Sequence, residues 1–151
     1  MSDSSQGLTI AVGSDHAGLE ARHELIRGLC DRGHEVLDLG TETSASCDYP
    51  DFAKAVAAAV TAGKARFGVL VCGTGQGMVM TANRLPGIRA GLVFDEFSAR
   101  MIRAHNDANI ICFGARIQAV AAMERLLEIF VATEFEGGRH QRRVNKIMGA
   151  S

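Results

Sequence analysis

Short, continuously apolar segments alternate with helix-like segments along the whole of this chain. The apolar runs lie at 8–12, 35–39, 67–72, 89–93 and 109–113, and the helix-like stretches at 18–32, 51–62, 77–83, 96–104, 118–133 and 139–148. Strands that are apolar on both faces are typical of a parallel sheet covered by helices on each side. The pattern predicts an α/β fold: a doubly wound, three-layer α/β/α sandwich with a five-stranded parallel sheet and an extra C-terminal helix.

Length and composition favour one globular domain. The chain has 151 residues, 47% of them hydrophobic, and shows no repeat or linker, so we expect a single domain over 1–151 with a disordered lead-in at 1–7. A formal net charge of -1 offers no basic field for nucleic acid or for a membrane surface. The absence of a secretory signal and of a membrane-length apolar run predicts a cytoplasmic location.

The four cysteines are widely spaced, which argues against a disulfide framework or a zinc site. Cys30 falls on the apolar face of a predicted helix and Cys112 inside a predicted strand, where a free thiol behaves as a small hydrophobe. We expect no metal and no cofactor.

The segment Cys72-Gly73-Thr74-Gly75-Gln76-Gly77 directly follows the apolar run 67–71. In open α/β sheets, ligands bind at the carboxyl ends of the strands. The glycines permit a tight turn and a close approach to backbone N–H groups, while Cys72 and Thr74 add a thiol and a hydroxyl. This segment therefore predicts an active site, although Cys72 could also be an ordinary packed strand residue.

Polar residues follow other predicted strands as well. Asp15 and His16 come after the first strand, at the edge of the sheet that also receives Cys72, so these groups can share one pocket. Asp15 has an alternative explanation as a helix cap. His105 lies at the far end of a helix, on the opposite edge, where it is either a C-cap residue unrelated to the pocket or a group brought there by a second subunit.

Two further features have functional and structural interpretations. Arg139 and Arg143 are four residues apart on a predicted helix and so point the same way, which would suit a phosphate, although a charge run is commonly a solvated face. Tyr49 lies in a loop, either as a substrate contact or as a loop anchor. A dinucleotide site is disfavoured, because neither glycine-rich turn has the Gly-x-Gly-x-x-Gly spacing and no P-loop is present.

Taken together, the motifs resemble the type B ribose-5-phosphate isomerase family, which also includes galactose-6-phosphate and allose-6-phosphate isomerases. The resemblance extends from Ile10 to about Ile147 and rests on Gly13-Ser14-Asp15-His16-Ala17-Gly18, Asp48-Tyr49-Pro50, Cys72-Gly73-Thr74-Gly75-Gln76-Gly77, Ala82-Asn83-Arg84, Gly87-Ile88-Arg89-Ala90, His105-Asn106-Asp107, Phe113-Gly114-Ala115-Arg116 and Glu136-Gly137-Gly138-Arg139-His140. It implies a Rossmann-like subunit that forms a homodimer, or a tetramer, with active sites at the subunit interface.

The resemblance also implies roles for individual residues. Cys72 is expected to be the catalytic base and His105, supplied by the neighbouring subunit, the ring-opening acid. Thr74 is the third expected catalytic residue and would hold the reacting oxygens. The expected substrate-binding residues are Gly73, Gly75, Gln76 and Gly77 for the same oxygens, Asp15, His16, Tyr49 and Asn106 for the sugar, and Arg116, Arg139 and Arg143 for the substrate or its phosphate. One branch of the family uses a glutamate just after the glycine loop. Met78 stands there in this chain, so the thiol branch fits.

The implied reaction interconverts D-ribose 5-phosphate and D-ribulose 5-phosphate through an ene-diolate, in the non-oxidative branch of the pentose phosphate pathway. Two alternatives stay open at this point. One is an isomerase for a six-carbon sugar phosphate, and the other is a phosphosugar-binding subunit without catalysis.

Overall fold

The computed structural model describes residues 7–149, so all of the predicted lead-in except Gly7 lies outside the described residues. The strands are β1 (Thr9–Ser14), β2 (Glu35–Asp38), β3 (Phe67–Cys72), β4 (Ala90–Leu92) and β5 (Ile110–Gly114). The helices are the short 3-10 helix η1 (His16–Gly18) and α1 (Leu19–Asp31), α2 (Tyr49–Thr61), α3 (Gln76–Ala82), α4 (Glu96–Ala104), α5 (Val120–Ala132) and α6 (Arg139–Ile147).

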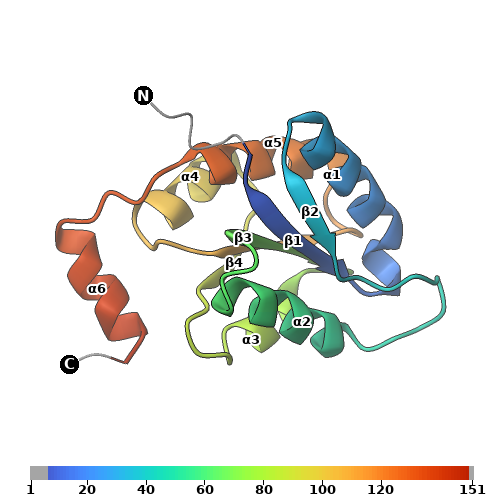
Figure 1. Cartoon of the computed structure of the whole chain (residues 1–151), viewed down its shortest axis with the longest axis horizontal. Coiled ribbons are helices and arrows are strands. Elements are labelled where there is room, and N and C mark those ends of the chain that lie inside the picture. Colours follow the sequence, from blue (N-terminus) through green and yellow to red (C-terminus); the bar gives the residue numbers. More distant parts are fainter. Residues whose placement is uncertain (1–6, 150–151) are drawn as a thin grey trace.

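The five strands form one sheet in the order β2-β1-β3-β5-β4, with every neighbouring pair parallel. Helices α1, α4 and α5 cover one face of this sheet, and α2 and α3 cover the other (Figure 1). The prediction of a three-layer α/β/α sandwich is confirmed. Helix α6 is the additional C-terminal helix, and it extends from the side of the layers.

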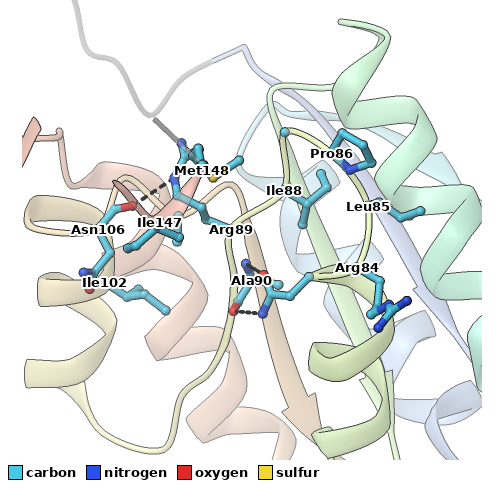
Figure 2. A pocket seen from close by; sticks show the side chains of 14 residues that line it. Arg84, Leu85, Pro86, Ile88, Arg89, Ala90, Ile102, Asn106, Ile147 and Met148 are labelled. Atoms are coloured by element: carbon cyan, nitrogen blue, oxygen red, sulfur yellow. Dashed lines mark hydrogen bonds between the residues drawn. The ribbon is translucent and has the colours of Figure 1, made fainter. Parts of the chain in front are cut away.

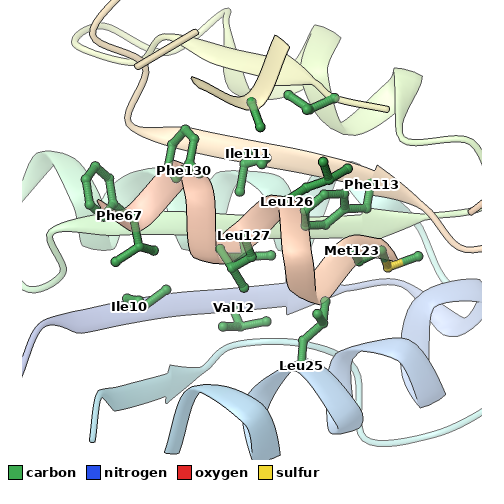
Figure 3. Packing of buried hydrophobic residues seen from close by; sticks show 14 of the residues in the cluster. Ile10, Val12, Leu25, Phe67, Ile111, Phe113, Met123, Leu126, Leu127 and Phe130 are labelled. Atoms are coloured by element: carbon green, nitrogen blue, oxygen red, sulfur yellow. The ribbon is translucent and has the colours of Figure 1, made fainter. Parts of the chain in front are cut away.

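The larger of the two hydrophobic clusters lies between the sheet and helices α1, α4 and α5. The continuous apolar runs of the strands supply its sheet side. Ile10 and Val12 of β1 and Ile111 of β5 point toward Leu127 and its neighbours on α5 (Figure 3), and all four side chains are buried. Burying apolar surface in this way is the main favourable term in folding. Both faces of the central strands are occupied, which explains why their sequences do not alternate.

Two predicted details need correction. Helix α2 begins at Tyr49 rather than at 51, because Pro50 fits within the first turn, where its missing N–H costs nothing. Cys30 is exposed rather than packed on the inner face of α1. Leu25 and Leu29 form that face, and one further residue turns Cys30 about 100° away from it. Cys112, in contrast, is buried within β5, as predicted.

Within residues 7–149, no helix combines the length and apolarity needed to cross a bilayer.

Candidate functional site

A cavity of about 310 Å³ opens at the carboxyl ends of β1 and β3. Its lining consists of Asp15, His16, Ala17, Tyr49, Cys72, Gly73, Thr74, Gly77 and Arg116. Apart from Ala17, each of these residues belongs to the set predicted from the sequence. The two strand ends do share one pocket, because β1 and β3 are parallel neighbours whose final residues lie side by side.

Cys72 lines this cavity. Cys72 is the last residue of β3 and is 5% exposed. Its Sγ accepts a hydrogen bond from the Gly75 N–H at 3.2 Å. Gly75 has φ of 82°, and a Cβ on it would lie 2.5 Å from Leu92 Cδ1, so only glycine allows the loop to fold back onto the sulfur. The loop therefore directs one of its own N–H groups at the sulfur.

Three backbone N–H groups of the loop are available for a ligand. Gly75 N–H is used by Cys72, and Gln76 N–H donates to Thr74 Oγ1 at 3.4 Å. The N–H groups of Gly73, Thr74 and Gly77 donate to no other group within the described part of the chain. Because these three residues line the cavity, a negatively charged oxygen bound beside the thiol would meet free backbone donors.

Cys112 is the other thiol near this region, and its environment excludes it as a base. Burial raises the pKa of Cys112, and the nearby Cys72 raises it further. Cys112 is 0% exposed and borders no described cavity. A thiol that stays protonated and has no access to solvent cannot take a proton from a ligand.

Asp15 and His16 combine a structural role with a place in the cavity. Asp15 Oδ1 accepts hydrogen bonds from the N–H groups of Ala17 at 3.0 Å and Gly18 at 3.3 Å, so Asp15 does cap η1. The Nδ1 atom of His16 accepts the Cys47 N–H at 3.2 Å. An accepting Nδ1 carries no proton, so the proton of the ring is on Nε2. His16 therefore offers a donor to a ligand.

Tyr49 and Arg116 form the walls of the cavity. A Cβ on Gly77 would lie 2.2 Å from Tyr49 Cε1, so the ring packs directly on the backbone of the loop. Arg116 covers Gly73 in the same way, with Nη1 3.3 Å from the position of a Cβ. Among the described residues no carboxylate forms an ion pair with Arg116. Its charge is free to pair with an anionic ligand.

The structure places His105, Asn106, Arg139 and Arg143 away from this cavity. His105 caps the C-terminus of α4, just before β5 begins, whereas Cys72 pairs with Gly114 at the other end of β5. One strand length, roughly 13 Å at about 3.3 Å per residue, therefore separates the two edges. Arg139 and Arg143 project from α6 and are exposed. Gly75 and Gln76 belong to the glycine loop but do not line the cavity.

His105 belongs to a separate cluster of polar groups. Its ring stacks on that of His140, with centroids 4.0 Å apart and planes at 12°. Glu136 Oε1 lies 3.7 Å from His105 Nε2 and 3.6 Å from His140 Nε2. Metal-ligating atoms of the three residues lie within 4.8 Å of one another. Nearly parallel rings direct their nitrogen lone pairs side by side rather than at one point, which does not suit tetrahedral coordination.

A larger cavity of about 550 Å³ lies at the same edge as this cluster, between the 83–90 segment and the end of α6 (Figure 2). Ile102, Ile147 and Met148 supply much of its apolar wall. Of the predicted site residues only Asn106 lines it, and the Asn106 carbonyl accepts from Arg89 Nε at 3.0 Å. This cavity holds no thiol and no histidine, so its size does not make it the centre of chemistry.

Sequence reasoning missed the residues that hold the cavity lining in place. Cys47 fixes the His16 ring through its N–H, although 31 positions separate the two residues. No local pattern could have indicated that contact, because it depends on the path of the loop between β2 and α2.

Comparisons with known proteins show which family this chain resembles. The family model for Ribose/Galactose Isomerase matches residues 10–147. The chain is 42% identical to ribose-5-phosphate isomerase B of Escherichia coli (strain K12) over 138 residues, which cover 91% of this chain and 93% of that protein.

Solved structures show the same likeness. The crystal structure of a ribose 5-phosphate isomerase from Thermotoga maritima superposes with a TM-score of 0.91 at 43% identity, covering 93% of this chain and 97% of that one. The type B ribose 5-phosphate isomerase of Trypanosoma brucei gives a TM-score of 0.92 at 38% identity, covering 97% and 100%.

Proposed function

This chain belongs to the ribose/galactose isomerase family, and we propose that it interconverts D-ribose 5-phosphate and D-ribulose 5-phosphate as one domain over 1–151. The observation that carries the proposal is the Cys72 thiol, which lines a cavity beside three free backbone N–H groups. Its relatives of similar length bear that activity in their names. We place the reaction in the cytoplasm, in the non-oxidative branch of the pentose phosphate pathway.

Cys72 is the proposed base. Its thiolate takes the proton from C2 of the open-chain aldose, and the electron pair of that bond forms a C1–C2 double bond while O1 becomes negative. The proton of the O2 hydroxyl then passes to O1, and as O2 becomes the carbonyl oxygen the Cys72 thiol returns its proton to C1. No electrons leave the sugar, so the step needs no redox cofactor. The thiol is suited to this role because it faces the cavity and already accepts one N–H donor.

The glycine loop is the proposed oxyanion site. The N–H groups of Gly73, Thr74 and Gly77, together with the Thr74 hydroxyl, would donate to the oxygens that become negative in the ene-diolate. His16 would donate from Nε2, and Asp15 and Tyr49 would contact the sugar hydroxyls. The Arg116 guanidinium would pair with an anionic group of the substrate.

A second copy of the chain completes the proposed site. His105 as the ring-opening acid, Asn106 as a sugar contact, and Arg139 and Arg143 as phosphate ligands lie on the edge opposite Cys72. They can meet the Cys72 cavity only if a neighbouring subunit supplies them. We therefore propose a homodimer, or a tetramer built from it, with each active site shared between two chains.

Turnover by the purified chain tests the proposal. Ribose 5-phosphate, allose 6-phosphate and galactose 6-phosphate are supplied separately to one preparation, and ketose formation is followed. We expect the highest kcat/KM with ribose 5-phosphate. A preference for a six-carbon phosphate would favour the alternative that the family name also allows. Binding of all three without turnover would identify a phosphosugar-binding subunit and overturn the proposed activity.

A further inference from the structure

Arg22 is an arginine whose charge lies inside the protein. It lies near the N-terminus of α1 and is 0% exposed. Its Nη1 donates to Ser14 Oγ at 2.6 Å and its Nη2 to the Thr41 carbonyl at 2.5 Å. Its Nε lies 3.0 Å from Asp38 Oδ1. Burying a charge is costly unless it is paired. The groups that pair with this guanidinium therefore indicate what it does.

The partners of Arg22 belong to three different segments. Ser14 is the last residue of β1, Asp38 is the last residue of β2, and Thr41 lies in the loop 39–48 that leads to α2. The same loop is tied to β1 by the Thr41 N–H, which donates to the Ser14 carbonyl at 3.2 Å. One side chain therefore sets the spacing between two strand ends and a loop.

These segments carry one side of the Cys72 cavity. Ser14 immediately precedes Asp15 and His16, which line the cavity. Beyond Thr41, the loop 39–48 reaches Cys47, whose N–H holds the His16 ring, and then enters α2 at Tyr49. A shift of the guanidinium would therefore move both ends of the Cys47–His16 hydrogen bond.

Gly40 shows how closely the loop packs on the guanidinium. A Cβ at this position would lie 2.0 Å from Arg22 Nη1 and 2.3 Å from Arg22 Cζ. Gly40 has no positive φ, so its backbone would accept any residue and the space alone demands glycine. Its N–H also donates to Asp38 Oδ1 at 3.3 Å. The loop and the guanidinium fit each other without room for one methyl group.

We propose that Arg22 is a positioning residue for the sugar-binding side of the active site. The guanidinium acts through Ser14 and the loop 39–48. It positions the side chains of His16 and Tyr49 relative to Cys72. It lines no part of the cavity and touches no substrate. The inference deepens the proposed function and rests on it wherever catalysis is the readout.

The planar fork of arginine is essential to this role. Two terminal nitrogens, held in one plane, donate to Ser14 and Thr41, while Nε lies 3.0 Å from Asp38 Oδ1 in an ion pair without a hydrogen bond. A lysine would keep the charge but offers one nitrogen, which cannot reach all three partners from the same place. Charge retention and correct positioning can therefore be separated by Arg22→Lys.

The first test compares kinetics of variants that disturb the guanidinium in different ways. We expect KM for ribose 5-phosphate to rise about threefold in Arg22→Lys and about tenfold in Arg22→Met, with kcat changed less than about twofold, because binding residues are displaced. Gly40→Ala should raise KM to a similar degree, since it removes no hydrogen-bonding group and only pushes the guanidinium aside.

Matched controls come from α1 and its C-cap, Arg32. Arg32→Lys alters an arginine whose partner Glu128 is exposed, and Gly28→Ala adds a methyl group that meets only the ends of the Glu124 and Arg32 side chains. Both should keep the KM of the unaltered chain. Ser14→Ala deletes a single partner of the guanidinium. If Arg22→Met does not fold, the KM of Ser14→Ala for ribose 5-phosphate replaces it as the test and should rise.

The second test needs no turnover. The ¹⁵N shifts of the His16 ring should show a protonated Nε2 and an unprotonated Nδ1, with the signal assigned by its loss in His16→Gln. In Arg22→Lys and Gly40→Ala the two shifts should converge, because the Cys47 N–H no longer holds one tautomer. A folded Arg22→Met, Gly40→Ala or Ser14→Ala with unaltered KM and unaltered His16 shifts would overturn the inference. Shifts that converge in a chain without isomerase activity would support the inference while rejecting the proposed function.

Discussion

At the scale of single residues, the environment of two neighbouring thiols separates their chemistry. Cys72 and Cys112 lie on adjacent strands, yet only Cys72 reaches the cavity and accepts an N–H donor. Cys112 is held protonated by burial. Position at the end of a strand, rather than the presence of sulfur, is therefore what singles out Cys72 as the proposed base.

Replacing Cys72 by alanine should abolish exchange of the substrate C2 proton with solvent, while binding of ribose 5-phosphate survives. The alanine removes the proposed proton acceptor but leaves the free N–H groups of the loop. Proton NMR in heavy water measures the exchange, and calorimetry measures binding. Cys112→Ala serves as the control and should retain exchange. Full wash-in of solvent deuterium by the Cys72 variant would remove Cys72 from its proposed role.

Gly77→Ala should lower kcat/KM about tenfold, because the added methyl group displaces the Tyr49 ring from the cavity wall. Gly28→Ala, on α1, is the matched glycine control and should leave kcat/KM unchanged. Steady-state kinetics of both variants measure the effect, with thermal melts to show that each is folded. Equal kcat/KM in the two variants would mean that the position of Tyr49 does not matter for the reaction.

At the scale of helices and strands, most of the fold could be predicted from the sequence, because each element has a local signature. The predicted ranges for β3 and α4 coincide with Phe67–Cys72 and Glu96–Ala104. The strand-end residues of the cavity were found because parallel topology gathers such residues at one edge.

What could not be predicted are contacts between distant segments. Arginine is rarely buried, so nothing in the sequence marks Arg22 as an interior residue. The hydrogen bond from Cys47 to His16 and the stacking of His105 on His140 likewise depend on how loops and helices pack. These contacts are tertiary, and local patterns carry no information about them.

The junction of α4 with α6 should make stability depend on pH through His140. Burial, the nearby His105 and Arg139 lower the pKa of His140, while Glu136 opposes them. The unfolded chain takes up this proton near about pH 6.5, whereas the folded chain resists it. The free energy of unfolding should therefore fall as pH drops below about 6.5 and be fully present above it.

Urea unfolding at about pH 7.5 and about pH 5.5 measures this loss, and His140→Gln should lose less stability over that interval than the unaltered chain. His23→Gln, at an exposed position on α1, is the control and should lose as much as the unaltered chain. An identical loss in all three proteins would show that His140 makes no contribution.

At the scale of the whole molecule, the separation of Cys72 from His105 predicts how a mixture of two inactive variants should behave. Cys72→Ala and His105→Ala chains should each be almost inactive toward ribose 5-phosphate. Refolded together in equal amounts, they should recover about a quarter of the unaltered activity, because half of the dimers are mixed and each holds one intact site. Activity assays on the mixture measure the recovery. A mixture as inactive as its components would contradict sharing of sites between chains.

Dialysis against a chelator should leave kcat/KM unchanged, since the proposed proton transfer uses a thiol and backbone donors. If a metal ion did take part, the cluster that could hold it is formed by His105, Glu136 and His140. The measurement is turnover before and after dialysis. A loss of activity that one divalent cation restores would assign a metal to the molecule.

The proposed sharing of each site between two chains would also make activity depend on protein concentration. A lone copy would carry a base without an acid at one rim and an acid without a base at the other. Serial dilution would therefore lower the specific activity because dimers dissociate, and concentrating the protein would restore it. The expression level of the protein would then alter the flux through the reaction more than in proportion, with no dedicated effector required.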